Sequence, residues 1–309
     1  MTKEIFNPQD AIDSATGLRK ASGYQDTQKI LETQGITPEA LNQTPPVGLN
    51  LVLLSQMTII KELKQGLNGS DLNTAILGIA IAEGVPDFKN FLNTSLNCNW
   101  QSLSVFDLDH SILEKVDQIA QQNNLENVFT FQQDVRSTNL ETCSQDLTLR
   151  DHVDNCCPPG ISRSIQPEVK RITRPGGISL VNITTSESLD QSNREIIPHN
   201  KLTHLLEPKI VQALQSEIFS LKELKQRFGN HLESLRGKLL EIEPSESLAI
   251  FGENEVGHGE WFRTLEAHQQ SWLETDFEII GMKVRVGKDS HNPPLQCIRH
   301  NVVLRKKHG

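Results

Sequence analysis

The sequence predicts an α/β fold built on a largely parallel sheet. From Thr74 onward, short apolar runs alternate with amphipathic segments, which is the pattern of βαβ units. The first run, 75–77, enters a turn of small residues at 78–84, and the next two runs end in acids, at Asp107 and Asp134. Because ligands of open α/β sheets sit beyond the carboxyl ends of the strands, these residues predict a nucleotide-shaped pocket at that edge.

Composition restricts the class of protein and its partners. The chain has 309 residues, 36% of them hydrophobic, which suits a globular protein with one large core or two modest ones. Thirty basic and 39 acidic residues give a net charge of −9, so nucleic acid is an unlikely partner. Residues 1–20 contain no apolar core of signal-peptide length, and no apolar run approaches twenty residues, so we expect no membrane association and a cytoplasmic location.

The five cysteines show no CxxC spacing, so neither a disulfide framework nor a zinc site is expected. The histidines of the second half were also considered as metal ligands. His258, Glu260 and His268 match no ligand set, and we expect no metal.

The first half of the chain is expected to hold a helical cap and most of the sheet. Residues 1–70 are polar and helical in pattern, with one long helix after Pro45 and Pro46 that ends near Gly66. A helix capped by Asp109 or Ser111 should follow the second strand, and another should be closed by residues 174–177. Strands are expected at about 74–80, 102–108, 127–132, 145–150 and 177–183.

The second half is expected to add an insertion and complete the sheet. A polar linker begins at Thr184, and a largely helical insertion should run to about Gly257. A helix containing Trp261, Leu265 and Trp272 should lead into an antiparallel hairpin of strands that begin near Phe277 and Gln296. The expected units are a cap (1–70), a Rossmann-like cofactor-binding core (71–186), a helical lid insertion (187–257) and the completion of the core sheet (258–309).

This order of elements resembles that of the class I S-adenosylmethionine (SAM)-dependent methyltransferases. The resemblance covers about 72–186 and 258–309, and it implies a Rossmann-like sheet that is parallel except for an antiparallel strand at the C-terminal hairpin. It also implies SAM as cofactor and S-adenosylhomocysteine (SAH) as product.

The same resemblance implies a set of cofactor-binding residues. In the family a Gly-x-Gly-x-Gly loop follows the first strand, and the acid that ends the second strand accepts hydrogen bonds from the ribose hydroxyls, which suits a group that only accepts. An acid after the third strand accepts from the adenine amino group, and the next backbone amide contacts the ring. In this chain the loop positions are Gly78, Ala80, Ala82 and Gly84, the ribose acid is Asp107 or alternatively Asp109, Leu108 packs beside adenine, and Asp134 and Val135 form the third motif.

Residues near the methyl group are expected in the segment that follows the fourth strand. Asp151, His152 and Asp154 are the candidate general bases, and His152 has the unperturbed pKa best suited to neutral pH. Cys156 and Cys157 are nucleophiles or, by preference, small buried side chains. Methyl transfer is an in-line displacement that positioning alone can accelerate, so no side-chain catalyst is obligatory.

The leading hypothesis is therefore an enzyme that methylates a small or medium-sized molecule beneath a lid. Ala80 and Ala82 replace family glycines, and alanine restricts positive φ angles, which motivates the alternative of a binding or scaffold protein without turnover. A third hypothesis is a methyltransferase acting on protein or RNA. The acceptor atom and the oligomeric state are left open.

Overall fold

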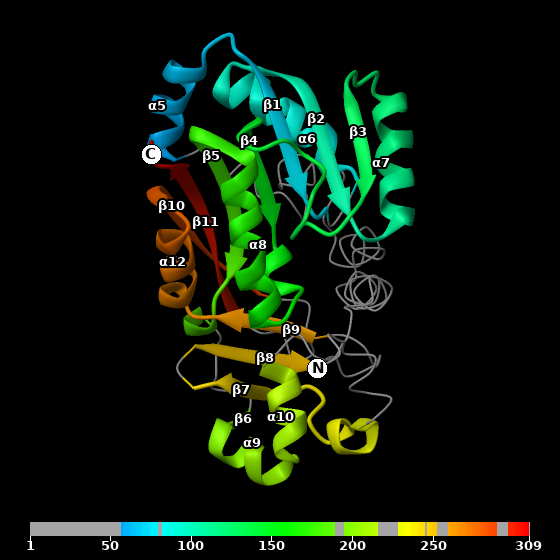
Figure 1. Cartoon of the computed structure of the whole chain (residues 1–309), viewed down its shortest axis with the longest axis vertical. Coiled ribbons are helices and arrows are strands. Elements are labelled where there is room, and N and C mark those ends of the chain that lie inside the picture. The colour runs from blue at the N-terminus through cyan, green and yellow to red at the C-terminus, as the bar shows by residue number, and fades with distance from the viewer. Residues whose placement is uncertain are drawn as a thin grey trace, which may run out of the picture.

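The computed structural model describes residues 57–79, 82–188, 195–215, 228–244, 246–251, 259–288 and 296–308 (Figure 1). Most of the expected N-terminal cap and part of the expected insertion lie outside these residues, as does Ala80. Within the described residues, no helix is both long and apolar enough to cross a membrane.

A seven-stranded sheet forms the centre of the molecule. Its order is β10-β11-β5-β4-β1-β2-β3, and β11 runs antiparallel to both of its neighbours while β1 to β5 pair in parallel. This arrangement confirms the predicted Rossmann-like sheet with its antiparallel C-terminal strand. The strands are β1 (Asp71–Leu77), β2 (Asn99–Asp107), β3 (Val128–Gln132), β4 (Gln145–Asp151), β5 (Thr173–Thr184), β10 (Phe277–Lys288) and β11 (Gln296–Lys306).

Strand β5 begins earlier than its sequence pattern predicts. Helix α8 (Pro159–Ile172) passes directly into the strand at Thr173, so Pro175 and Gly177 belong to β5 rather than to a turn. The register with β4 shifts between Gln145 and Leu147, which accommodates the extra residues. Proline disfavours a continuing helix because it has no N–H, so the sequence pattern predicts a helix end at these residues. Its fixed φ is also compatible with extended backbone, so the same residues can begin a strand.

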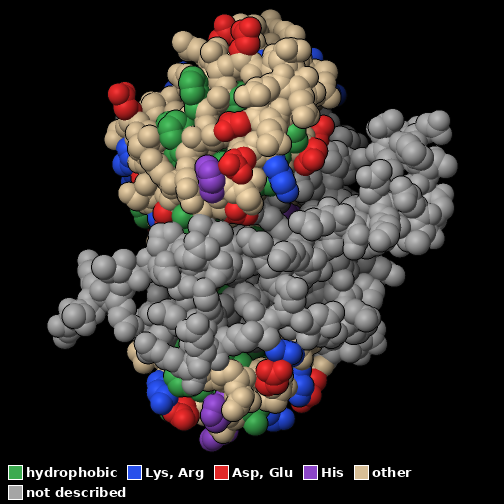
Figure 2. Space-filling model, turned by 90° about the vertical axis from the view of Figure 1, so that its right-hand side faces the viewer, with side chains coloured by type: hydrophobic (Ala, Val, Ile, Leu, Met, Phe, Trp, Pro, Cys, Tyr) green, Lys and Arg blue, Asp and Glu red, His purple; other side chains and the backbone are tan. Residues whose placement is uncertain are grey.

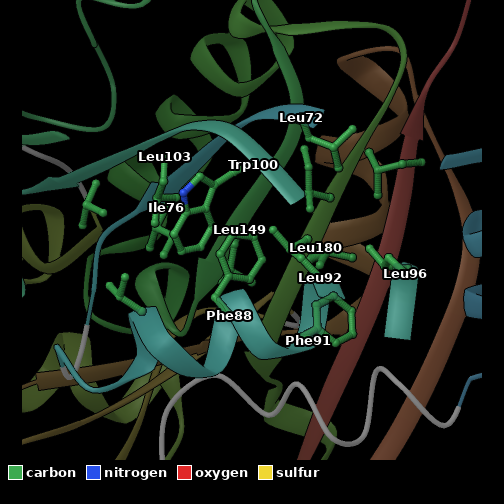
Figure 3. Packing of buried hydrophobic residues seen from close by; sticks show 14 of the residues in the cluster. Leu72, Ile76, Phe88, Phe91, Leu92, Leu96, Trp100, Leu103, Leu149 and Leu180 are labelled. Carbon is green, nitrogen blue, oxygen red and sulfur yellow. The ribbon is translucent and has the colours of Figure 1, made fainter. Parts of the chain in front are cut away.

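Helices cover both faces of the sheet. On one face α5 (Thr58–Leu67), α6 (Gly84–Phe91) and α7 (His110–Gln122) pack on an apolar cluster that includes Phe88 and Trp100, shown in Figure 3. On the other face α8 and α12 (Leu265–Glu274) pack on a second cluster, which includes Trp272 and Phe277. We call these the α6 face and the α8 face. A sheet of parallel strands buried on both sides needs such a cover.

A second, smaller sheet follows the core and was not predicted. It has the order β6-β7-β8-β9, with β6 (Ile196–Ile197), β7 (Leu239–Glu243), β8 (Ser247–Phe251) and β9 (Gly259–Arg263). Helices α9 (His199–Leu205) and α10 (Pro208–Gln215) share an apolar cluster with β7, β8 and β9, at the lower end of Figure 1. The described part of 187–257 therefore contains strands as well as the expected helices.

Trp261 lies in strand β9, not in the helix predicted to contain it. Helix α12 begins only at Leu265, because Thr264 acts as its N-cap and accepts a hydrogen bond from Ala267 N at 3.1 Å. The spacing of four residues between Trp261 and Leu265 imitates a helical stripe, although a strand ends and a helix begins between them.

Asn155 connects the two sheets. Its side-chain Nδ2 donates to Thr184 O at 2.7 Å, at the end of β5, and to Trp261 O at 2.8 Å, in β9. Its Oδ1 accepts from Thr184 N at 2.9 Å. Asn155 itself follows β4, so one buried amide holds the second sheet against the carboxyl edge of the core sheet.

Candidate functional site

The turn after β1 requires glycine at position 78. Gly78 has a φ of +78°, and its N donates to Phe106 O at 2.8 Å. This bond holds the turn after β1 against the end of β2. A Cβ built there would lie 2.5 Å from Val153 Cγ2, which belongs to the short helix after β4. The turn therefore brings the ends of β1, β2 and β4 together.

The other loop positions lie deeper in the core. Ala82 is fully buried in the α6-face cluster, and Gly84 is the first residue of α6. Ala80 lies outside the described residues. Its predicted role, like that of the whole loop, stays a prediction.

Asp107 is buried at the end of β2 and holds two turns. Its Oδ2 accepts from Ile79 N at 3.0 Å, in the turn after β1, and its Oδ1 accepts from Asp109 N at 2.9 Å. Asp109 instead caps α7, since its Oδ1 accepts from Ser111 N at 2.9 Å. The capping role leaves Asp107 as the better placed ribose acid.

The third motif contains a partner that the sequence did not point to. Asp134 forms an ion pair with Arg136, with 2.8 Å between Oδ2 and the Arg136 NH2 nitrogen, and its Oδ1 accepts from Arg136 N at 2.9 Å. Val135 is partly buried against the α8-face cluster. Leu108 is half-buried, and its carbonyl oxygen accepts from Gln132 Nε2 at 3.1 Å. The Gln132–Leu108 bond joins the ends of β3 and β2, and the cofactor-binding roles of Leu108, Asp134 and Val135 stay predictions.

Asp151 ends β4 as a buried carboxyl group. Its Oδ1 accepts from Asn182 Nδ2 at 2.9 Å, while its Oδ2 has no hydrogen-bond partner among the described residues. Burial raises the pKa of Asp151 to about 7, against the lowering effects of the Asn182 hydrogen bond and the charge of Arg299. A carboxyl group with this pKa can exchange a proton near neutral pH.

His152 follows with a left-handed backbone, at a φ of +57°. Its N donates to Asn182 O at 2.9 Å, and its Nε2 lies 4.0 Å from Asp151 Oδ1. The unusual backbone turns the chain sharply at the end of β4, which places the imidazole beside the Asp151 carboxyl group.

The third candidate base, Asp154, forms a structural ion pair. Its Oδ2 lies 3.1 Å from Arg150 NH1, and its Oδ1 accepts from Ser162 Oγ at 2.7 Å, all fully buried. Burial alone would raise the pKa of Asp154, but Arg150 and the other groups around it hold that pKa below its ordinary value. Asp154 is thus a permanent anion that is already satisfied by its neighbours.

Neither Cys157 nor His268 has the environment of a reactive group. Burial raises the pKa of the Cys157 thiol well above its usual value, and its Sγ donates to Val153 O at 3.2 Å. Cys156 is exposed, so the prediction of a small buried side chain is wrong at that position. Burial lowers the pKa of His268 to about 3, and its ring stacks on Trp272. Among the described residues, no group of three or more His, Cys, Asp or Glu side chains could hold a metal ion.

Comparison with known proteins identifies the fold. No protein-family model matches the chain, and no curated protein matches it. Among solved structures, a SAM-dependent methyltransferase from Methanosarcina mazei shares 12% identity, over 82% of this chain and 98% of its own, with a TM-score of 0.50. The YcgJ protein from Bacillus subtilis shares 14% identity, over 81% and 97% of the two chains, with a TM-score of 0.47. At this identity the likeness to the Methanosarcina protein shows the fold alone, and that fold is the predicted class I methyltransferase fold.

Proposed function

We propose that this chain is a SAM-dependent methyltransferase that acts on a small or medium-sized molecule, with Asp151 as its general base. The observation that carries the proposal is the placement of two buried carboxyl groups at one edge of the sheet. Asp107 ends β2 and Asp151 ends β4, and the Gly78 turn lies between them at the end of β1. Ligands of open α/β sheets bind at this edge.

The residues present fit the cofactor. The turn at Gly78 lets backbone approach closely, and the Asp107 carboxylate, which accepts from Ile79 N in that turn, is the group that would accept from the ribose hydroxyls. Leu108, Asp134 and Val135 would contact the adenine from the ends of β2 and β3. When bound, SAM supplies an electrophilic methyl group on a sulfonium.

The chain's own residues would then position the acceptor and manage its proton. Asp151 Oδ2 would accept a hydrogen bond, and then the proton, from an O–H or N–H group of the acceptor molecule. The pKa of about 7, which burial produces, leaves Asp151 substantially ionised and still basic at neutral pH. The Nε2 of His152 lies 4.0 Å from Asp151 Oδ1, so His152 would have to move closer before it could take over this proton.

Cofactor binding is the direct test. Isothermal calorimetry with SAH should show binding to the wild-type chain and a loss of affinity of about tenfold or more for Asp107→Ala, since hydrogen bonds to a charged group contribute about 1.5–3 kcal/mol. Asp117→Ala is the matched control, because Asp117 is an exposed residue of α7 whose carboxylate accepts, among the described residues, only from Thr130 Oγ1. Melting curves without SAH would show that both variants fold. Equal SAH affinity in wild type and Asp107→Ala would remove the ribose contact from the proposal.

A binding or scaffold protein without turnover is the second candidate. One observation favours it: the Asp134 carboxylate already pairs with Arg136, so an adenine amino group would have to share that acceptor. A thermal-shift measurement separates the two candidates, because ligand that binds the native state raises the melting temperature. The enzyme hypothesis requires a rise with SAH, and the scaffold hypothesis requires none.

Nucleic acid is the less favoured acceptor. On the face shown in Figure 2, Lys and Arg side chains of the described residues are dispersed among acidic ones rather than gathered in a patch. The net charge of −9 agrees with this distribution. A small molecule therefore suits the described surface better than a polyanion.

A further inference from the structure

Three polar side chains form a row across the carboxyl edge of the core sheet. Asp151 of β4 pairs in register with Asn182 of β5, which pairs in turn with Asn301 of β11. Beyond this row, Asn301 pairs with Lys283 of β10. Register partners project from the same face of a sheet. Leu149, Leu180 and Val303, each two residues from one member of the row, belong to the α6-face cluster, so the row lies on that face.

The side chain of Asn301 is buried and makes no hydrogen bond with the described residues. It is 0% exposed, and neither its Oδ1 nor its Nδ2 has a partner among the described residues. At the other end of the row, Asp151 Oδ2 is also unpartnered, while Oδ1 accepts from Asn182. A buried amide with both atoms unpaired is unfavourable, so a group outside the described structure is expected to satisfy it.

Position distinguishes Asn301 from other unpaired buried groups. Thr148 and Ser179 also carry buried hydroxyls without partners among the described residues. Thr148 lies three residues from Asp151 in β4, and Ser179 lies three residues from Asn182 in β5, so both hydroxyls project from the α8 face. Asn301 instead shares a face and an edge with the candidate base. This alignment points to a ligand rather than to a packing defect.

Resting on the function proposed above, we propose that Asn301 binds a neutral carboxamide-type group, such as an amide or lactam, of the methyl acceptor. The nucleophile would lie at Asp151, two strands away. Adjacent strands are about 4.8 Å apart, so the two groups of the acceptor would be roughly 10 Å apart at most. A medium-sized molecule spans this distance.

The chemistry of the row selects a neutral group that both donates and accepts. The Asn301 side chain offers a donor group, its NH2, and an acceptor, its Oδ1, in one plane, and a second amide can pair with both. A carboxylate has no donor to offer and would leave Asn301 Oδ1 unpaired, even though Lys283, the register partner of Asn301, would attract its charge. A cation would be opposed by Arg299, whose charge acts on Asp151 and which lies two residues from Asn301 along β11, and by Lys283 in register with Asn301.

The test uses acetamide and acetate as probes with ¹⁵N-labelled protein in the presence of SAH. The side-chain amide signals of Asn301 are assigned by their absence from the spectrum of Asn301→Asp. Acetamide at up to about 100 mM, the range for so small a fragment, should shift these signals saturably, and acetate should not. In Asn301→Leu, acetamide should no longer shift the signals of neighbouring backbone amides saturably, whereas in the control Ser179→Ala it should still do so.

Two further measurements make the outcome decisive. Asn301→Leu should melt at or above the wild-type temperature, because an unpaired amide is replaced by an apolar group of similar size. A clear drop in melting temperature would show that Asn301 is satisfied structurally, for example by an ordered water, and would overturn the inference. Unmoved Asn301 signals, or an equal response to acetate, would also overturn it. If wild type binds SAH in calorimetry while acetamide has no effect, only the carboxamide site fails; if SAH does not bind, the proposed function fails.

Discussion

The stability of this protein should depend on pH through Asp151. Burial raises the pKa of this carboxyl group from 3.8 to about 7 in the folded chain. Between these two values the folded state keeps the proton and the unfolded state releases it, so the folded state binds more protons. Stability therefore falls as the pH rises from about 4 to about 7 and changes little outside that range.

The size of the effect follows from the shift. A difference of about three pKa units corresponds to roughly 4 kcal/mol at about 1.4 kcal/mol per unit. The substitution Asp151→Asn removes the titration and keeps an oxygen that can accept from Asn182 Nδ2. Wild type should thus lose up to about 4 kcal/mol relative to the variant across this pH range.

Urea unfolding of both proteins at pH 4.5, 5.5, 6.5 and 8 measures this difference. The gap in unfolding free energy should widen in favour of Asp151→Asn at about 1.4 kcal/mol per pH unit up to about pH 7 and then level off. Other titrating groups occur in both proteins and cancel, apart from His152, whose ring lies beside the substituted carboxyl group. A gap that stays constant with pH, or widens toward low pH, would refute the assignment of a protonated, buried Asp151.

Two further substitutions test the architecture around the site. Gly78→Ala should lower the unfolding free energy by about 2 kcal/mol or more, because φ is positive there and the new Cβ would meet Val153. The control is Gly66→Ala in the last turn of α5, where no atom lies within 4 Å of the new Cβ, and it should raise the unfolding free energy by up to about 1 kcal/mol. Denaturant titration of the pair checks this, and similar effects for both would contradict the need for glycine in the turn. Arg150→Met should cost about 3–5 kcal/mol because it leaves Asp154 buried without its cation. A loss below about 1 kcal/mol in the same assay would show that Asp154 does not depend on the pair.

The core sheet was predictable because its signals are local. Each parallel strand is a short apolar run, and the acids at Asp107 and Asp134 follow directly from the strand ends. The helix after Asp109 was also predictable, since a capping side chain and an apolar stripe suffice to define it. The antiparallel C-terminal hairpin was equally clear, and together these elements gave the correct fold.

The second sheet was not predictable in the same way. Its strands have two to five residues, and runs this short cannot be assigned by periodicity. Trp261 and Leu265 then imitate a helical stripe across the boundary between β9 and α12. Strand pairing with distant residues, which no local pattern records, made these segments strands.

By itself, the sequence determined the order of elements, the turn at Gly78 and the acids at the strand ends, because backbone sterics and apolar periodicity act over a few residues. Only the tertiary structure decided which acid does what. Asp109 caps a helix, Asp154 pairs with Arg150, and Asp151 is buried next to an amide that lies 31 residues away in the chain. The pKa of a carboxyl group and its hydrogen-bond partners depend on atoms brought from distant strands, so the candidate base and the row that ends at Asn301 emerge only when β4, β5 and β11 lie side by side.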